Sequence, residues 1–516
     1  MSLNSTTNEW AGYLAQEHWA GYVEQAKQVP ASRWAILALI NAPILAVLFN
    51  ALWQKIAPRK ATDPPVVFHW LPIIGSAIWY GNDPIGFFQT CQERYGNVFT
   101  FILLGRKVTV ALGAKGNNFI LGGKSTAFNA EGAYTHLTTP VFGKDVVYDC
   151  PNEVFMQQKK IRQVRAHDGE LLRDPRFTTY QQNDVNEWGS FDAIAAMAEI
   201  TILTASRTLQ GKEVREGLNK SFSQLYSDLD GGFTPLNFLF ANLPLESYRK
   251  RDRAQKKMSD FYVDIIKRRR ANPDGDHHYD MIASLTEQKY RGGAALRDHE
   301  IAHIMIALLM AGQHTSSATL AWTMLHLASR PDVAQSLYDE QVERFGNKDG
   351  SFRAMEYEDL RHLPVLDSII RETLRVHPPI HSIMRQVRED VPVPPSLAAP
   401  ASKSGNGVYV VPKDTYVLAS PIISQVDPRV WNNASTWEPS RWSDAAGVAA
   451  QALHAYTDES GEKIDYGFGA IGTILATLIR RVELRLPTKV PEHNYHTLIL
   501  MPKDPKSVHY RRRRFD

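Results

Sequence analysis

The chain contains little cysteine. Only Cys91 and Cys150 occur among its 516 residues. Two cysteines are too few for a disulfide scaffold, and this usage fits a reducing compartment. Neither belongs to a Cys-x-x-Cys pair, and we expect both to be small, buried apolar side chains.

Net charge is also low. The formal net charge is +3, and no long basic stripe precedes the run Arg511–Arg514. We interpret that run as a solvated tail, and we expect no nucleic-acid partner. Hydrophobic residues make up 44% of the chain and aromatic residues 10%. This composition is ample for a core, and the length allows one large domain or two ordinary ones.

The segment Trp34–Trp53 is a long apolar run without charged residues. A run of about 20 residues is long enough to span the hydrocarbon core of a bilayer. Tryptophan at both ends suits the membrane interfaces, and the basic residues Lys55, Arg59 and Lys60 that follow predict a cytoplasmic body. The sequence therefore predicts a lumenal segment (1–33), a transmembrane anchor (34–53), a proline-rich linker (54–75) and one large domain (76–516).

Helical patterns dominate that domain. Apolar periodicity predicts helices over residues 83–95, 156–160, 193–210, 250–270, 298–330, 333–345, 363–376 and 470–482. Alternating patterns predict a hairpin over 98–112 and strands over 407–421 and 497–501. Residues 134–152 are expected to form a loop. The predicted fold class is mainly α with a small β part.

The most informative stretch is Glu300–Thr319, an apolar helix with a polar interruption. We expect Asp298 to be its N-cap. Gly312 costs about 1 kcal/mol relative to alanine, but it lets something large and flat lie against the backbone. His314 and Thr315 can donate, accept and pass protons. A core helix with a tolerated glycine is the alternative interpretation.

A charged pair lies on a later predicted helix. Glu372 and Arg375 are three residues apart, so they share one helix face and can pair. Flanking apolar residues predict that the pair is partly buried. Arg441, within Trp437–Trp442, is a candidate third member.

A short motif offers a different function. His299–His303 satisfies H-E-x-x-H, which would place two imidazoles and a glutamate base at a zinc-protease site. The pattern is short and prone to false positives, so the zinc protease is a remote alternative.

Several motifs together carry a resemblance to a known family. They are YTHLTTPVFGKDVVYDCPN, YSDLDGGFTPLNFLF, EIAHIMIALLMAGQHTSSAT, ETLR, IHSIMRQV, WEPSRW and IDYGFG. In these motifs the chain resembles the cytochrome P-450 superfamily, and specifically fungal sterol (lanosterol or eburicol) 14-alpha demethylases. The resemblance extends from the predicted anchor nearly to the C-terminus.

The resemblance implies a cytochrome P-450 fold behind a single membrane anchor in the endoplasmic reticulum, with the body on the cytoplasmic side. It also implies a haem-thiolate monooxygenase that removes the sterol 14-alpha-methyl group in ergosterol biosynthesis. The haem is the cofactor, and electrons come from NADPH through cytochrome P-450 reductase.

The resemblance assigns roles residue by residue. Hydrogen bonds to the haem propionates are implied for Tyr134, Tyr148, Lys159 and Arg385, with Gly312 against the haem face. The sterol pocket is implied for Phe142, Phe233, Ala311, Ile380, Ser382 and Met384. His314 with Asp230 matches a proton-delivery pair, and Thr315 matches the hydroxyl beside bound oxygen. Glu372, Arg375 and Arg441 match the residues that fix the proximal side.

The chain departs from the family at the haem-ligand loop. That loop has the form F-x-x-G-x-R-x-C-x-G, and its cysteine thiolate is the proximal iron ligand. Here Ile464–Ala470 runs directly into Ile471–Arg480, and no cysteine follows Cys150. Residues 161–188 also differ from the family. A non-catalytic, membrane-anchored sterol-binding paralogue and a truncated gene product therefore stay open as alternatives to an active enzyme.

Overall fold

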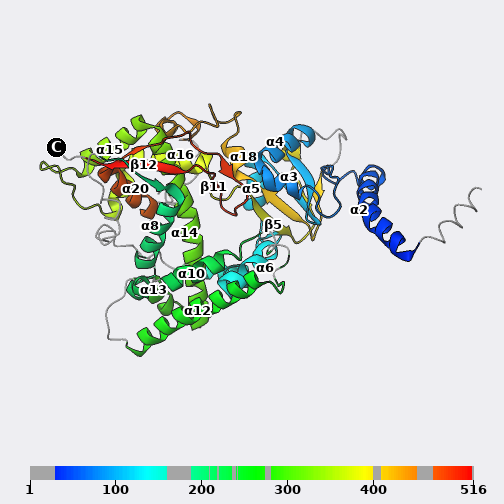
Figure 1. The fold of residues 1–516 in the computed structure, drawn as a ribbon, viewed down its shortest axis with the longest axis horizontal. Coiled ribbons are helices and arrows are strands. Elements are labelled where there is room, and N and C mark those ends of the chain that lie inside the picture. Colours follow the sequence, from blue (N-terminus) through cyan, green and yellow to red (C-terminus); the bar gives the residue numbers. More distant parts are fainter. Residues whose placement is uncertain are drawn as a thin grey trace, which may run out of the picture.

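The fold is mainly helical, and its described strands form one five-stranded sheet and three small ones. A computed structural model describes residues 30–159, 187–208, 210–217, 220–234, 237, 240, 242–272, 280–398, 408–449 and 469–513. Helix α14 passes through the middle of the body. The helices α10, α12 and α13 lie at the end opposite to α15 and α20 (Figure 1). The predicted fold class, mainly α with a small β part, is confirmed.

The helices agree with most of the predicted ranges. Their bounds are α2 (Ala31–Ile56), α3 (Ala77–Asn82), α4 (Pro84–Tyr95), α5 (Gly113–Leu121), α6 (Glu131–Phe142), α7 (Asn152–Lys159), α8 (Ala193–Thr208), α9 (Lys212–Gly217), α10 (Lys220–Asp230), α12 (Glu246–Ala271), α13 (Met281–Glu287), α14 (Asp298–Ser329), α15 (Pro331–Phe345), α16 (Pro364–Val376), α17 (Pro395–Ala398), α18 (Pro421–Gln425) and α20 (Gly469–Arg481). Three short 3-10 helices are η1 (Val147–Asp149), η4 (Tyr357–His362) and η5 (Pro439–Trp442).

The strands form one larger sheet and three small ones. Their bounds are β1 (Val98–Leu103), β2 (Arg106–Ala111), β3 (Phe128–Asn129), β4 (Gly189–Asp192), β5 (Ile383–Val387), β6 (Val391–Pro392), β7 (Val410–Val411), β8 (Tyr416–Ala419), β9 (Val482–Arg485), β10 (His493–Asn494), β11 (Met501–Pro502) and β12 (Ser507–Arg512). The larger sheet has the order β1-β2-β8-β5-β3. Its predicted hairpin is confirmed, because β1 pairs antiparallel with β2 around Leu104 and Gly105, which both have positive φ.

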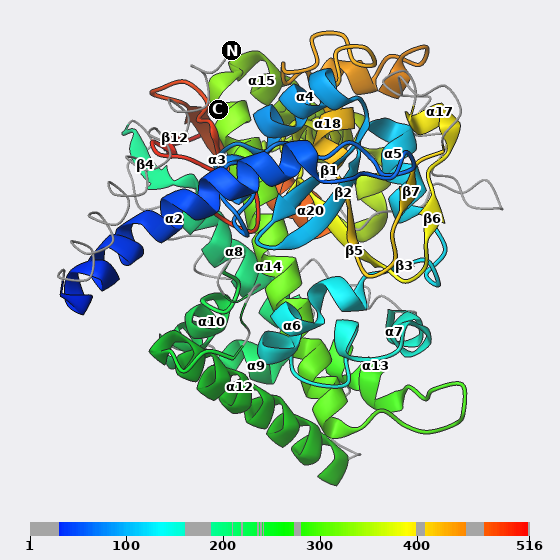
Figure 2. The same cartoon turned by 90° about the vertical axis from the view of Figure 1, so that its right-hand side faces the viewer.

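Helix α14 is the central element, as the sequence predicted. It packs along α8 and α12, and Figure 2 shows it running from α12 towards α8 and α20. The predicted N-cap is wrong by one residue, since the helix begins at Asp298 and its N-cap is Arg297. The Glu300 carboxylate accepts a hydrogen bond from the Arg297 backbone N–H at 2.7 Å, whereas Asp298 pairs with Arg270. Glu300 therefore fulfils the capping role that we assigned to Asp298.

The predicted loop over 134–152 is partly wrong, because α6 occupies its first part. Pro140 and the threonines suggested a loop, but Ala133, Leu137 and Val141 lie four residues apart and bury one helix face. Thr135 also donates its hydroxyl to the backbone carbonyl of Glu131 at 2.7 Å. Tertiary packing thus overrides the weak helix propensity of this segment.

The C-terminal predictions need two corrections. The last strand is β12 and not 497–501, of which only Met501 is in a strand. The arginine run is not a solvated tail, because β12 is the middle strand of the sheet β4-β12-β9. Arg511 pairs with Glu483 at 2.7 Å, and the guanidinium of Arg513 lies 3.8 Å from the ring centroid of Tyr338. Arg514 lies outside the described residues.

The predicted membrane anchor is not supported. In the part of the chain that the structure describes, no helix combines the length and the apolar character needed to cross a bilayer. The anchor range lies within α2, where Asn41, Pro43 and Asn50 reduce the apolar character. The later part of the predicted linker contacts the sheet, since Val66 bridges to Thr100 and Gly75 to Leu103 of β1.

Candidate functional site

Helix α14 is exposed at one point along an otherwise buried length. Most of its residues from Ile301 to Ala328 are buried, but Ala311 is exposed and Gly312 is half-buried. A methyl group placed on Gly312 would meet no atom within 4 Å outside its own helix turn. The predicted polar interruption at Gly312 therefore borders open space. This fits the prediction that a large, flat group lies against the helix backbone at this point.

His314 lies at this opening together with two side chains of α10. Its Nε2 atom is 2.9 Å from the Asp230 carboxylate and 2.9 Å from the Tyr226 hydroxyl. The structure thus brings together the pair that the sequence predicted and adds Tyr226 to it. Burial raises the pKa of Tyr226, and the nearby charge of Asp230 raises it further, so the phenol stays protonated and can donate or accept.

Thr315 follows on the same side of the helix. Its hydroxyl donates to the Ala311 backbone carbonyl at 2.8 Å. This bond uses the proton of the hydroxyl and leaves its oxygen free to accept. The hydroxyl can rotate towards a ligand only by giving up that bond, a property that suits a group that hands over a proton.

The residues predicted to line a sterol pocket lie on several elements. Phe142 at the end of α6 and Phe233 after α10 have ring centroids 5.7 Å apart. Ser382 contacts the His381 ring at 2.7 Å between Oγ and Nδ1, and Ile380 beside it is 46% exposed. The pocket roles of Phe142, Phe233, Ala311, Ile380, Ser382 and Met384 stay predictions.

Three of the four residues predicted to face haem propionates lie together. The rings of Tyr134 and Tyr148 are stacked with centroids 5.4 Å apart. The Met384 backbone N–H donates to the Tyr134 hydroxyl at 2.8 Å, which places that phenol beside strand β5. Burial raises the pKa of both tyrosines, and the neighbouring charge of Arg385 opposes this. Two phenols and a guanidinium can bind carboxylates.

The fourth residue, Lys159, points elsewhere. It is the last residue of α7 and is exposed, with its ammonium 4.2 Å from the ring centroid of Phe155. The chain beyond it, including the unusual segment 161–186, lies outside the described residues. Its propionate role stays a prediction without a contact behind it.

The predicted charged cluster forms around Glu372 of α16. Glu372 is fully buried and accepts from Arg375 at 2.8 and 2.9 Å and from Arg441 at 2.9 Å. The Trp442 indole donates to the same carboxylate at 2.9 Å. Arg375 also donates to three backbone carbonyls, so it fixes the chain between α18 and η5. The burial is deeper than the sequence predicted.

A row of imidazoles next to that cluster was missed in the sequence. His326 on α14 and His377 after α16 approach at 2.7 Å between their Nε2 atoms. The Nδ1 atom of His377 lies 2.6 Å from His493, whose own Nδ1 is 3.2 Å from the Tyr495 hydroxyl. We call His326, His377 and His493 the imidazole chain. No spacing signal reveals it, since His493 is distant in sequence.

Two tryptophans enclose the imidazole chain. Trp322 stacks on His377 with centroids 3.8 Å apart, and Trp437 stacks on His326 at 4.7 Å. Burial lowers the pKa of His326 to about 3, and it lowers that of His377 well below its usual range. It lowers the pKa of His493 to about 4. All three rings are therefore neutral near pH 7.

The H-E-x-x-H motif serves packing between α14 and the segment before η1. His299 lies 3.0 Å from the Asp145 carboxylate, and His303 lies 2.9 Å from the Lys144 carbonyl. Glu300 caps the helix. The two imidazoles are thus engaged separately, and no group of metal-ligating side chains occurs among the described residues. Nothing here supports the zinc-protease alternative.

The two cysteines are buried and free, as predicted. Cys91 lies in α4 and Cys150 follows η1. Burial raises the pKa of each thiol to about 12, so neither is a ready thiolate. Residues 450–468, which precede the point at which the loop motif is missing, lie outside the described residues. The residues present thus fit the propionates and distal face of a haem but do not supply its proximal thiolate.

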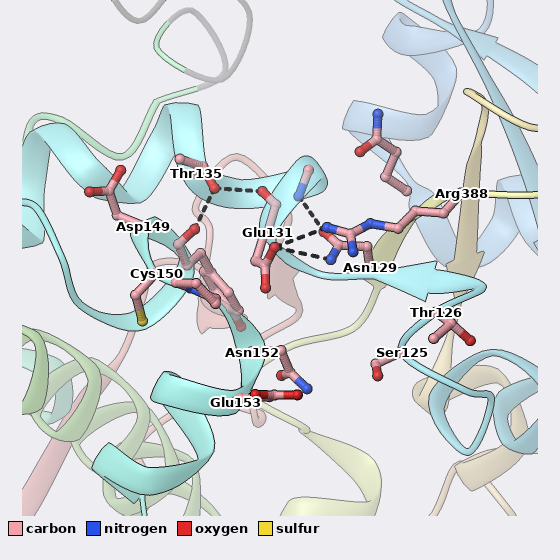
Figure 3. Close-up of a pocket in the computed structure, with 14 residues that line it drawn as sticks. Ser125, Thr126, Asn129, Glu131, Thr135, Asp149, Cys150, Asn152, Glu153 and Arg388 are labelled. Atoms are coloured by element: carbon pink, nitrogen blue, oxygen red, sulfur yellow. Dashed lines mark hydrogen bonds and ion pairs between the residues drawn. The ribbon is translucent and has the colours of Figure 1, made fainter. Parts of the chain in front are cut away.

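A separate cavity of about 660 Å³ lies beside α6. Figure 3 shows Glu131 reaching both Arg388 and Asn129 on one wall, with Cys150 and Glu153 on another. Of the predicted site residues only Tyr148 lines it. Most residues that line this cavity are polar or charged, and it is not the predicted sterol pocket.

Comparisons with known proteins agree with the fold. The profile of the family described as "Cytochrome P450" matches residues 64–460. The chain belongs to the cytochrome P450 family. The solved structure of retinoic acid-bound cyanobacterial CYP120A1 superimposes with a TM-score of 0.70, covering 88% of this chain and all of that one. At 20% identity it speaks for the fold alone.

Closer relatives share one activity. The lanosterol 14-alpha demethylase of Mycosarcoma maydis is 47% identical, covering 91% of this chain and 92% of that protein. The sterol 14-alpha demethylase cyp51A of Aspergillus fumigatus is 42% identical over 93% and 96%. The lanosterol 14-alpha demethylase erg11 of Schizosaccharomyces pombe is 38% identical over 93% and 99%. These relatives are P450 monooxygenases of sterol metabolism.

Proposed function

We propose that this chain is a sterol 14-alpha demethylase that takes a sterol of the lanosterol or eburicol class. The observation that carries the proposal is the opening in α14, where Gly312 borders free space and His314 stands beside it with Asp230. A flat ligand can lie there, and a carboxylate–imidazole pair can supply protons to it.

The chain's own residues would divide the work. Apolar side chains such as Phe142 and Phe233 would enclose the sterol body and exclude water. Asp230 and His314 would hold and pass protons at Nε2 of the ring, and Thr315 would offer a hydroxyl next to the reacting group. Tyr134, Tyr148 and Arg385 would bind the carboxylates of a haem, which supplies the oxygen chemistry when it is bound.

The proximal ligand is the point at which this proposal can fail. No cysteine follows Cys150 in the sequence, and a thiolate is what favours O–O cleavage in this family. We therefore derive no step through the haem iron. The proposal predicts haem retention by the full chain, because Tyr134, Tyr148 and Arg385 lie together and would bind the propionates.

Two measurements on the purified full chain test the proposal together. Lanosterol titration should show saturable binding, and turnover with NADPH and a cytochrome P-450 reductase should give a sterol lighter by the methyl group. A reduced, CO-bound difference spectrum reports the proximal ligand. Saturable sterol binding without a thiolate-type Soret band and without product would show that the pocket persists but the reaction does not.

The cellular setting is part of the same proposal. The resemblance to sterol 14-alpha demethylases implies the endoplasmic reticulum membrane, with a reductase partner on the cytoplasmic side. We propose this location for the chain. Exposed apolar side chains of α2, among them Leu45, Phe49 and Trp53, would favour contact with a lipid surface. Fractionation of cells that express the full chain, followed by carbonate extraction, tests this part.

A further inference from the structure

Tyr226 and Asp230 reach the same nitrogen of His314 from one face of α10. Both their distances to Nε2 are 2.9 Å. Tyr226 is only 7% exposed, whereas the Asp230 side chain is 46% exposed. The phenol is therefore enclosed next to the ring, while the carboxylate also reaches solvent. Within the described residues, the Nδ1 atom of His314 has no hydrogen bond.

The two partners differ in what they can do. An ionised carboxylate only accepts hydrogen bonds, so Asp230 can hold Nε2 only when that nitrogen carries a proton. A hydroxyl can accept from a protonated Nε2 and can donate to a deprotonated one. Tyr226 is thus suited to both states of the ring nitrogen, and Asp230 to one of them.

We propose that Tyr226 is a positioning residue that keeps Nε2 of His314 directed at α10 in both protonation states. This inference rests on the proposed proton-delivery role of the pair. A proton that Asp230 takes up from solvent passes to the unprotonated Nε2 of the Nδ1–H ring, and the Nδ1 proton leaves, so that one transfer converts the Nδ1–H tautomer into the Nε2–H tautomer. Tyr226 keeps the His314 ring from turning when Asp230 is not hydrogen-bonded to Nε2.

The rings of Tyr226 and His314 support this assignment. Their centroids lie 5.7 Å apart with planes tilted by 37°, so the phenol contacts the imidazole through its hydroxyl and not by stacking face to face. The tyrosine ring itself is part of the apolar cluster that includes Leu229 and Met258. That packing fixes the hydroxyl in place independently of Asp230.

The tautomer of His314 in the full chain tests the proposal. It is read by NMR of ring-labelled histidine in the absence of haem and sterol. In Asp230→Ala, Tyr226 is the remaining partner, and a phenol donates a hydrogen bond more strongly than it accepts one, so it favours the Nδ1–H tautomer. This tautomer should be about fivefold more populated in Asp230→Ala than in Asp230→Ala/Tyr226→Phe, the equilibrium equivalent of one ordinary hydrogen bond. We call this difference the rise due to Tyr226.

A matched control is Tyr262→Phe on the same Asp230→Ala background. Tyr262 is a fully buried tyrosine of the same cluster, and its hydroxyl bonds Gln210 at 2.7 Å without contacting His314. This control should keep the rise. If Asp230→Ala and Asp230→Ala/Tyr226→Phe show the same tautomer ratio, Tyr226 does not position the ring and the proposal is wrong.

A second readout applies if the double variant does not fold. In Tyr226→Phe alone, the Nε2–H proton of His314 should exchange with water about fivefold faster, because one of its two acceptors is gone. An unchanged rate would overturn the proposal. Both readouts are independent of turnover, so a failed demethylase assay leaves them intact and the two proposals fail separately.

Discussion

Two histidines on α14 lie in opposite surroundings. His314 borders an opening and is paired with a carboxylate and a phenol. His326, about three turns further along, is enclosed by Trp437 and by the neutral ring of His377. One helix thus carries an imidazole that has an ionic partner and solvent access, and another that has neither.

The difference shows that neighbours, and not the residue type, decide what a histidine can do. An imidazole beside a carboxylate can take up and release protons near neutral pH. An imidazole among neutral rings in a dry interior pays the full cost of desolvation when it is charged, and therefore stays neutral. In the buried cluster around Glu372, charge is tolerated because the carboxylate offsets the charges of Arg375 and Arg441.

The largest expected effect on stability comes from breaking the buried ion pairs of Glu372. Glu372→Ala leaves the buried guanidinium of Arg375 and the neighbouring Arg441 without their carboxylate. Removing one partner of a buried ion pair costs about 3–5 kcal/mol, so we expect this loss in the free energy of unfolding by urea. Glu358→Ala, at an exposed pair with Arg361, is the control and should change little. Equal effects would show that burial of the cluster does not matter.

The second prediction is that acid pH lowers the free energy of unfolding through the imidazole chain. Because burial depresses the folded-state pKa of the imidazole chain, the unfolded chain binds protons between about pH 4 and 6.5 while the folded chain does not. Stability is thus full above pH 6.5 and falls as the pH drops. One pH unit below 6.5, each ring contributes a loss of about 1.4 kcal/mol, or about 4 kcal/mol for three.

Urea unfolding at pH 7.5 and 5.5 measures this loss. His326→Phe should reduce the difference between the two pH values, since one protected ring is gone. The half-buried neighbours Arg330 and Glu438 are present in both proteins, so their contributions cancel in the comparison. A pH dependence that His326→Phe leaves unchanged would contradict the assignment of the loss to these rings.

A third prediction compares the histidines directly. His326→Ala removes a stacked ring and leaves Nε2 of His377 buried without its partner, which should cost about 2–3 kcal/mol. His314→Ala removes a half-buried side chain whose partner Asp230 reaches solvent, but it also leaves the buried Tyr226 hydroxyl without its hydrogen bond to His314. It should therefore cost about 1–2 kcal/mol, less than His326→Ala. The two free energies of unfolding are measured under the same conditions, and a reversed order would contradict the comparison.

The smallest effect is expected at the start of α14. The hydrogen bond from His299, followed by the charge of Arg297, holds the pKa of Asp145 below its usual range. The carboxylate is nearly half exposed, so Asp145→Asn should cost well under about 1 kcal/mol at pH 7. A loss of several kcal/mol in thermal or urea unfolding would show that this contact fixes the segment before η1.

Sequence patterns predicted what depends on local spacing. The periodic apolar residues placed α14, α16 and α20, and alternation placed the β1–β2 hairpin. The motif-based roles of Asp230 and His314 placed two residues that the structure brings to 2.9 Å. Tyr226 lies one turn before Asp230, so its position on the same helix face was open to inference from spacing.

Other features depend on contacts between distant segments. His377 and His493 meet only through the tertiary fold, and no local pattern marks them. Helix α6 forms because Ala133, Leu137 and Val141 bury a face, despite a proline in its last turn. The arginines of β12 looked like a tail because alternation is hard to see in a run of like charges, whereas pairing with β4 and β9 decided the outcome.

That pairing has a consequence for synthesis of the chain. Strand β4, which leads into α8, pairs only with β12 among the described strands, and β12 is made from residues 507–512. At about 5–20 residues per second, a ribosome needs roughly 15–60 seconds to produce the residues between them. Helix α8 and its strand therefore emerge long before their partner, and a chaperone that binds nascent apolar segments would find this edge uncovered during that interval.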